Sequence, residues 1–197
     1  MRHVPLLLLP AALLLAACQP QAPSGDAAGP GPDPTPAMAD TPEPAPAAAS
    51  ASAALAPTEG NAVAGNLEFA VVDGGIRITG EVTGLPPGGQ HGFHVHENGD
   101  CSAPDATSAG GHFNPTASAH GRVGEGEHHA GDSDNIAADD QGVATVDSLL
   151  RGATLGDGSP SDIVGKAVIV HADPDDYTTQ PTGNAGARLA CGVIEAR

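Results

Sequence analysis

Aromatic and basic residues are scarce in this chain of 197 residues. It has no tryptophan, one tyrosine and three phenylalanines, so any core must be built mainly from Val, Ile, Leu and Ala. Seven Lys and Arg residues stand against 24 Asp and Glu, which gives a formal net charge of −17. A chain this acidic repels phosphate groups, and this argues against a nucleic-acid-binding role.

The sequence also lacks an apolar run of the about 20 residues that a membrane-spanning helix needs. The leader, residues 1–17, instead combines a basic start, a short leucine-rich run and small residues, the pattern of a secretory signal peptide. Leu15-Ala16-Ala17-Cys18 resembles a bacterial lipobox, in which the cysteine is acylated and becomes the mature N-terminus. The alternative is an ordinary signal peptide with a coincidental cysteine.

After Cys18 the chain has almost nothing to bury until about residue 47. It consists mainly of Pro, Ala, Gly and Ser with scattered acids, a composition typical of a disordered tether. We therefore predict a signal peptide at 1–17, a lipid-anchored tether at 18–47 and a folded domain at 48–197. The expected location is the bacterial cell envelope, facing the periplasm. Gln19 resembles the sorting residue of lipoproteins sent to the outer rather than the inner membrane.

No stretch of the domain shows sustained helical periodicity, and short segments of strand character alternate with turn signals. The expected strands are 50–56, 65–72, 76–82, 92–97, 135–138, 143–149, 167–171 and 192–196. Tight turns at 73–75 and 139–142 are expected to join the second strand to the third and the fifth to the sixth. This pattern predicts an all-β fold, an eight-stranded Greek-key β-barrel or Ig-like sandwich. Two long segments, 98–134 and 173–190, are expected to be functional loops.

Histidine is concentrated in the middle of the domain, where eight of the nine lie between His91 and His171. On a strand, His94 and His96 would point to the same side, with Phe93 and Val95 facing the core. Taken alone, such a pair is usually solvent-facing.

Further histidines follow in the long loop and beyond it. His112, His120 and His129 with Asp132 supply three imidazoles and a carboxylate, which suit tetrahedral zinc. His171 ends an apolar strand, and with His94 and His96 it adds more nitrogen donors than one zinc ion needs. Clustered imidazoles suit copper(II), so this inventory indicates two metals, one of them redox-active.

Four motifs carry a resemblance to a known family. They are Gly92-Phe93-His94-Val95-His96-Glu97, Ser108-Ala109-Gly110-Gly111-His112-Phe113-Asn114-Pro115, His129-Ala130-Gly131-Asp132 and Thr182-Gly183-Asn184-Ala185-Gly186-Ala187-Arg188-Leu189-Ala190-Cys191-Gly192-Val193. Because these motifs occur in the order and at the spacing typical of that family, the chain from about residue 48 onward resembles the copper/zinc superoxide dismutases.

The resemblance implies one copper and one zinc ion per chain. The implied copper ligands are His94, His96, His112 and His171. The implied zinc ligands are His112, His120, His129 and Asp132, so that His112 bridges the two metals. His128 competes with His129 for its role, although only His129 begins the family's His-x-Gly-Asp pattern. Asp175 resembles the carboxylate that links a copper-bound to a zinc-bound histidine, with Asp173 and Asp176 as nearby rivals.

The implied activity is dismutation of superoxide to dioxygen and hydrogen peroxide by alternate reduction and oxidation of copper. Arg188 would attract the anion, and His112 would carry a proton. With Cys18 acylated, Cys101 and Cys191 remain to form a disulfide, which an oxidising compartment permits. Family members are monomers or homodimers. The alternative function is a periplasmic copper- or zinc-binding or metal-delivery lipoprotein of the same fold, although such domains typically lack part of this ligand set.

Two features depart from the family pattern. The segment Tyr177-Thr178-Thr179-Gln180-Pro181 has no lysine, a residue that this loop often carries in the family. Electrostatic guidance of superoxide would then depend on Arg188 and the metals. In addition, Cys101 lies closer to His96 than in cytosolic members, which indicates a secreted form.

Overall fold

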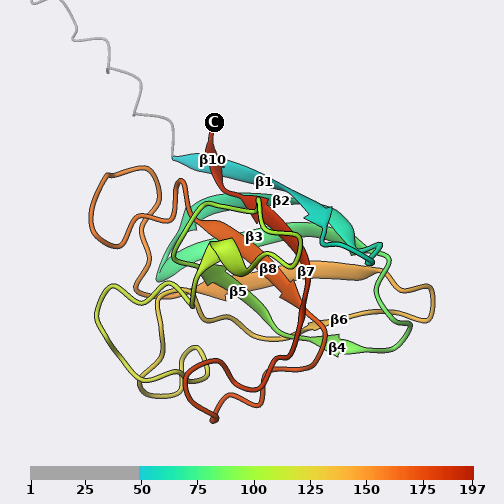
Figure 1. Ribbon diagram of the computed structural model, residues 1–197. Coiled ribbons are helices and arrows are strands. Elements are labelled where there is room, and N and C mark those ends of the chain that lie inside the picture. Colours follow the sequence, from blue (N-terminus) through green and yellow to red (C-terminus); the bar gives the residue numbers. More distant parts are fainter. Residues whose placement is uncertain (1–48) are drawn as a thin grey trace, which may run out of the picture. The chain divides into compact units, whose positions relative to one another are not determined.

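The computed structural model describes residues 49–197, which fall within one compact unit, Ala45–Arg197. The predicted signal peptide, Cys18 and the tether lie outside the described residues. Ten strands and one short 3-10 helix make up the described part (Figure 1). In chain order they are β1 (Ser50–Pro57), β2 (Ala64–Val72), β3 (Gly75–Thr83), β4 (Gln90–His91), β5 (Phe93–His96), η1 (Thr107–Ala109), β6 (Ile136–Ala137), β7 (Ala144–Leu150), β8 (Ala167–His171), β9 (Arg188–Val193) and β10 (Glu195–Ala196). Among these residues no helix is long and apolar enough to cross a bilayer.

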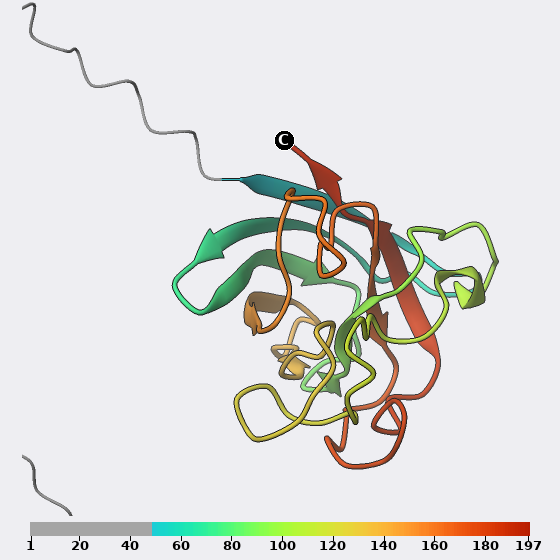
Figure 2. The same ribbon diagram turned by 90° about the vertical axis from the view of Figure 1, so that its left-hand side faces the viewer.

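The strands form a curled antiparallel sheet. Its order is β5-β8-β9-β1-β2-β3-β7, with β10 paired to β1, and β4 and β6 form a separate two-stranded ladder. Strands β7 and β8 follow one another in the chain but lie near opposite ends of this order, so the connection crosses over as in a Greek key. Figure 2 shows the curvature, with β2 and β3 bending away from β8 and β9. The all-β barrel prediction is confirmed.

Alternating burial explains why most strands form where they do. In β2, Leu67 and Phe69 are buried while their neighbours face solvent, and β3 buries Ile76 and Ile78 in the same way. This is the pattern of an antiparallel sheet with one face on the core. Strands β5 and β8 differ, because every one of their residues is buried. The long loops cover their outer face, and that face carries the histidines.

The last strand begins earlier in the structure than the sequence predicts. We expected it at Gly192 and placed Arg188 in the preceding loop, but β9 starts at Arg188. Its residues include Ala190 and Gly192, which have low strand propensity. They form a strand because β8 pairs with both of them and β1 pairs with Ala190 from the other side. Arg188 is thereby held opposite His171.

The two predicted turns have different outcomes. Val72 pairs with Gly75, which leaves Asp73 and Gly74 as a two-residue hairpin turn, with Gly74 at φ +88°. At the second site a turn does form, since the Gly142 amide donates to the Asp139 carbonyl at 3.0 Å. It does not close a ladder between its flanking strands, because β6 pairs with β4 and β7 pairs with β3.

Candidate metal centre

The first group of potential ligands comes from β5, β8 and the loop between β5 and β6. It consists of His94, His96, His112 and His171, all buried, and one nitrogen of each lies within 4.8 Å of the others. The period of β5 places His94 and His96 on one face, as predicted. His171 ends the neighbouring strand, and an isolated β-bridge between His96 and His112 brings the loop onto the same face.

The second group lies on the loop side of His112. His112, His120, His129 and Asp132 are all buried, and their ligand atoms also lie within 4.8 Å of one another. Asp132 is the centre of this group: its Oδ1 lies 2.8 Å from His112 Nδ1, and its Oδ2 lies 3.0 Å from His120 Nδ1. Its Oδ2 also accepts the amide of His129 at 2.8 Å, which fixes the carboxylate within the loop.

Unpartnered nitrogens test whether these groups suit metal ions. Four buried ring nitrogens that point into the two groups have no hydrogen-bond partner, namely His94 Nδ1, His112 Nε2, His120 Nδ1 and His129 Nδ1. The last two lie within 3.3 Å of Asp132 oxygens, but without hydrogen-bonding geometry. Buried polar atoms without partners are costly, and cations bound by these lone pairs would remove the cost. The residues present therefore fit two metals that share His112.

Asp175 connects the two groups by contacting one histidine of each at its Nε2 atom. Its Oδ2 lies 2.7 Å from His94 Nε2 and its Oδ1 lies 3.0 Å from His120 Nε2, with all three side chains buried. Each ring therefore turns its Nδ1 toward its group. Of the two rival carboxylates, Asp173 is exposed, and Asp176 accepts hydrogen bonds from Thr178 and Thr179. Among the described residues, no histidine ring forms a hydrogen bond or ion pair with either of these two carboxylates.

Burial and the Asp132 carboxylate set the protonation of the rings. Burial, then the neighbouring histidines, hold the pKa of His96 and of His171 well below the ordinary value. Burial also lowers the pKa of His112 to about 4. Burial disfavours charge on His120 too, but the carboxylates of Asp132 and Asp175 beside its two ring nitrogens outweigh it and raise its pKa to about 9. Neutral imidazole is the form that ligates metals, so His96, His112 and His171 are ready for binding, whereas His120 must lose a proton.

The two remaining histidines of the domain lie outside both groups. The His128 ring is half-buried and hydrogen-bonds the His129 carbonyl at 2.8 Å through Nδ1, so the geometry favours His129 in the second group. His91 is fully buried and hydrogen-bonds the His171 carbonyl at 2.9 Å. From the sequence, His91 was expected to be an ordinary polar residue, because a contact over 80 positions leaves no local pattern.

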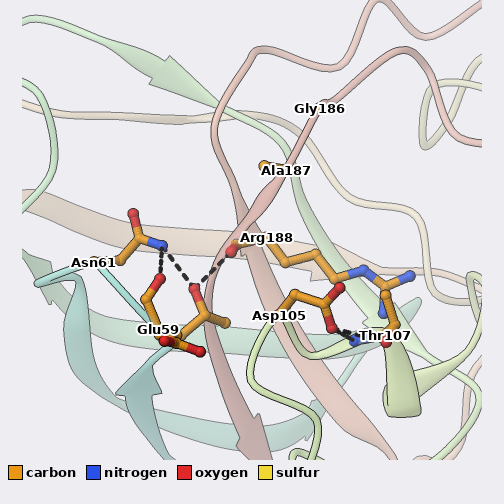
Figure 3. A pocket seen from close by; sticks show the side chains of 8 residues that line it. Glu59, Asn61, Asp105, Thr107, Gly186, Ala187 and Arg188 are labelled. Carbon is orange, nitrogen blue, oxygen red and sulfur yellow. Dashed lines mark hydrogen bonds between the residues drawn. The ribbon is translucent and has the colours of Figure 1, made fainter.

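Arg188 lies beside the first group and lines a hollow of about 370 Å³ (Figure 3). Its guanidinium donates to the carbonyl oxygens of Ala106 and Gly110, the latter at 2.6 Å. Burial lowers its pKa from the ordinary value, yet a guanidinium remains charged. Glu59 and Asp105 line the same hollow, so two carboxylates share it with the positive charge of Arg188.

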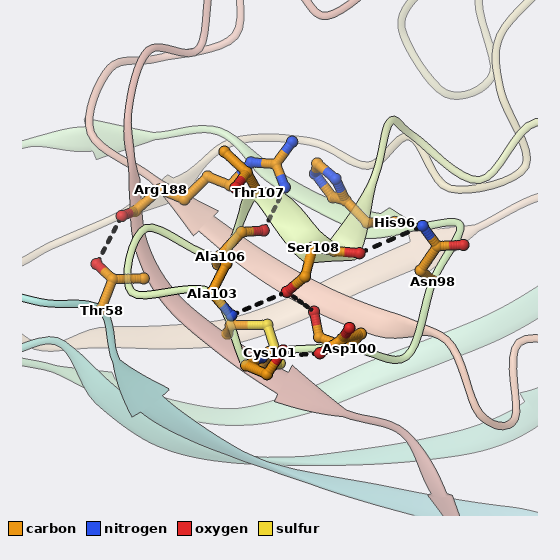
Figure 4. The surroundings of a disulfide bond; sticks show 12 residues. Thr58, His96, Asn98, Asp100, Cys101, Ala103, Ala106, Thr107, Ser108 and Arg188 are labelled. Atoms are coloured by element: carbon orange, nitrogen blue, oxygen red, sulfur yellow. Dashed lines mark hydrogen bonds between the residues drawn. A yellow bond between two sulfur atoms is a disulfide. The ribbon is translucent and has the colours of Figure 1, made fainter.

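The disulfide pairing predicted for Cys101 and Cys191 is confirmed, with their Cα atoms 5.8 Å apart (Figure 4). Cys191 lies on β9, so the bond fastens the loop that leads to His112 onto the strand of Arg188. Ser108 reinforces this loop by donating to the Asp100 carbonyl at 2.7 Å and accepting the Ala103 amide at 3.1 Å.

Comparison with known proteins gives a consistent result. Residues 63–194 match the family model described as copper/zinc superoxide dismutase. The chain is 42% identical over 143 residues to superoxide dismutase [Cu-Zn] 2 of Aquifex aeolicus, covering 71% of this chain and 83% of the relative. It is 43% identical over 141 residues to superoxide dismutase [Cu-Zn] 3 of Arabidopsis thaliana, covering 68% and 84%. The crystal structure of a SOD-like protein from Bacillus subtilis superposes with a TM-score of 0.66 at 40% identity, covering 72% and 96%.

Proposed function

The chain belongs to the copper/zinc superoxide dismutase family and dismutates superoxide to dioxygen and hydrogen peroxide, and we propose which of its residues serve each part of that reaction. His94, His96, His112 and His171 hold copper, while His112, His120, His129 and Asp132 hold zinc. The observation that supports this division is the pair of buried ligand groups that share His112 and leave ring nitrogens without partners. When bound, copper supplies alternate one-electron reduction and oxidation, and zinc supplies a fixed positive charge.

His112 is the proposed proton carrier. Its Nδ1 is directed at Asp132, 2.8 Å away, and its Nε2 lies in the first group without a protein partner. The ring can therefore hold a proton at Nε2 between the two half-reactions and release it to the product, while Nδ1 keeps the ring in place. Asp175 keeps His94 and His120 oriented during this exchange through its two hydrogen bonds.

Arg188 is the proposed anion-binding residue. Its guanidinium is fixed by two backbone carbonyls and faces a hollow open to solvent, where it can attract superoxide and hold it with a charge-assisted hydrogen bond. The lysine-free segment after Asp176 leaves Arg188 as the main protein charge for this task.

Metal analysis combined with a superoxide-decay assay tests these roles. The wild-type chain should carry one copper and one zinc ion. His94→Ala and His171→Ala should each abolish the activity but leave a folded protein that retains zinc. A His94→Ala protein with unchanged superoxide decay would overturn the assignment of the first group.

The cellular setting is a further part of the proposal. A lipid on Cys18 would anchor the chain in the cell envelope, in the outer membrane rather than the inner one. Residues 18–47 would then let the domain reach into the periplasm. The lipobox-like sequence and the composition of the tether support this. The Cys101–Cys191 disulfide is consistent with such an oxidising compartment.

A further inference from the structure

The loop segment without lysine, residues 177–181, contacts the second ligand group directly. The side-chain Oε1 of Gln180 accepts the backbone amide of His120 at 2.8 Å, and the Nε2 of Gln180 donates to the His120 carbonyl, also at 2.8 Å. Sixty positions separate the two residues in the chain. Their loops lie next to each other in both views of the fold (Figure 1, Figure 2).

These two bonds replace a strand partner for His120. In an antiparallel pair, one residue gives its amide and its carbonyl to the same opposite residue, and the Gln180 carboxamide does the same with one side chain. The segment 113–135 contains no strand, and among the described residues no other hydrogen bond reaches the His120 amide or carbonyl. The position of the His120 backbone therefore depends on Gln180.

The segment that carries Gln180 is anchored to the same carboxylate that orients the His120 ring. Asp175 Oδ1 lies 3.0 Å from His120 Nε2 and accepts the Tyr177 amide at 2.7 Å. The Tyr177 hydroxyl accepts the Asn135 amide at 2.9 Å, and Asn135 Nδ2 donates to the Asp175 carbonyl at 2.9 Å. His120 is thus fixed at its ring by Asp175 and at its backbone by Gln180, from a single connected segment.

We propose that Gln180 is a positioning residue for the zinc site, which sets the zinc affinity by fixing the backbone from which the His120 ring projects. This inference rests on the assignment of His120 to zinc made above. The segment that lacks the lysine then retains zinc instead of guiding superoxide. The chemistry requires glutamine, because the site needs one donor and one acceptor on a side chain long enough to reach both backbone atoms.

Two substitutions at Gln180 and one control test the proposal in the full-length protein. Gln180→Met keeps a similar length and removes both hydrogen bonds, whereas Gln180→Asn keeps the carboxamide on a side chain one methylene shorter. Gln141→Met is the matched control, since Gln141 is exposed in a turn and its side chain makes no hydrogen bond among the described residues. Zinc affinity is measured by competition with a chromophoric chelator. Cobalt(II) bound in place of zinc reports the ligand geometry through its visible spectrum, and thermal unfolding of the metal-free proteins reports stability.

We expect Gln180→Met to weaken zinc binding about 10-fold and to alter the cobalt(II) spectrum. This is the lower end of the loss in metal affinity that follows when a residue hydrogen-bonded to a metal ligand is removed. Gln180→Asn should show a smaller change in the same direction, and Gln141→Met should match wild type. Zinc affinity within twofold of wild type for both Gln180 variants, with unchanged cobalt(II) spectra, would overturn the proposal. So would a Gln180→Met protein that is less stable without metal but binds zinc normally. A wild-type protein that takes up no zinc would instead refute the underlying assignment of the second group.

Discussion

Arg188 and His96 hydrogen-bond to the same atom, the carbonyl oxygen of Gly110, at 2.6 Å from Arg188 Nη2 and 2.9 Å from His96 Nδ1. Gly110 lies two residues before His112, so one loop carbonyl fixes Arg188, the proposed anion-binding residue, beside two of the proposed copper ligands. Figure 4 shows His96 and Arg188 on the same side of this loop. The charge of Arg188 is therefore held beside the proposed copper ligands.

This arrangement predicts that the positive electrostatic field near Arg188 attracts superoxide more strongly than the acidic surface repels it. From residue 48 onward the chain has 20 Asp and Glu against six Lys and Arg, a formal charge of −14, but distant charges are screened beyond about 8–10 Å. Arg188→Glu should slow superoxide decay by roughly 10-fold or more. Arg188→Lys should slow it less, because it keeps the charge and loses only the fork geometry.

Salt dependence, measured by superoxide decay over a range of ionic strength, separates the two fields. Added salt should slow the wild-type protein, and it should slow Arg188→Ala less. If the wild-type rate rises with salt, the acidic surface dominates and the guiding role of Arg188 is wrong.

Asp132 is predicted to be essential for zinc retention, because its carboxylate contacts all three histidines of the second group. Asp132→Ala should weaken zinc binding by more than the roughly 10–100-fold that loss of an outer partner costs. Metal analysis after dialysis against a chelator measures this. Asp134→Ala is the control, since Asp134 is exposed and pairs with Arg122 on the surface; equal zinc loss in both variants would contradict the prediction.

Reduction of the disulfide should destabilise the domain and loosen the loop that carries His112. The cysteines are 90 positions apart, and for a loop of this length the chain-entropy model gives about 4–5 kcal/mol, the upper end of the usual range. Thermal unfolding with and without reductant measures the loss. Thiol titration of the unreduced, unfolded domain should detect no free thiol from Cys101 or Cys191, and two such thiols would refute the pairing.

Lipid attachment is predicted for Cys18. The mature chain should begin at an acylated Cys18 and partition with membranes, while Cys18→Ser should block both processing and acylation. Mass spectrometry of the mature N-terminus and membrane fractionation test this. Recovery of a freely soluble wild-type protein that begins at another residue would show that the lipobox interpretation is wrong.

Asp162 is predicted to make stability depend on pH away from the metal ligands. It accepts the amides of Gly156, Gly158 and Val164 at 2.7–2.9 Å, and although burial opposes this, these bonds lower its pKa from the ordinary value. A lowered folded-state pKa gives stability that is present above the unfolded pKa of about 4 and is lost as pH falls through the folded value.

Asp162→Asn should therefore lower the free energy of unfolding by about 1–2 kcal/mol at pH 7, and the difference from wild type should shrink as pH falls below about 4. Urea unfolding of both proteins over this pH range measures it. Asp140→Asn provides the control, because Asp140 is exposed and its side chain makes no hydrogen bond among the described residues. A difference that stays constant with pH would contradict the prediction.

Local sequence determined the parts of this protein that depend on spacing along the chain. Alternation with a period of two placed His94 and His96 on one face of β5, and the short segments bounded by turns predicted an all-β barrel. Recognisable motifs identified the residues of both ligand groups, and counting cysteines gave the pairing of Cys101 with Cys191.

Tertiary structure decided the relations that no local pattern encodes. The place of Arg188 at the start of β9 depends on its pairing with His171 of β8 and on β1, which pairs with β9 from the other side. The choice of Asp175 among three nearby carboxylates depends on His94, 81 positions away, and the role inferred for Gln180 depends on His120, 60 positions away. Hydrogen bonds over such separations form only when folding brings two loops together, so propensity and periodicity, which act over a few residues, carry no signal for them.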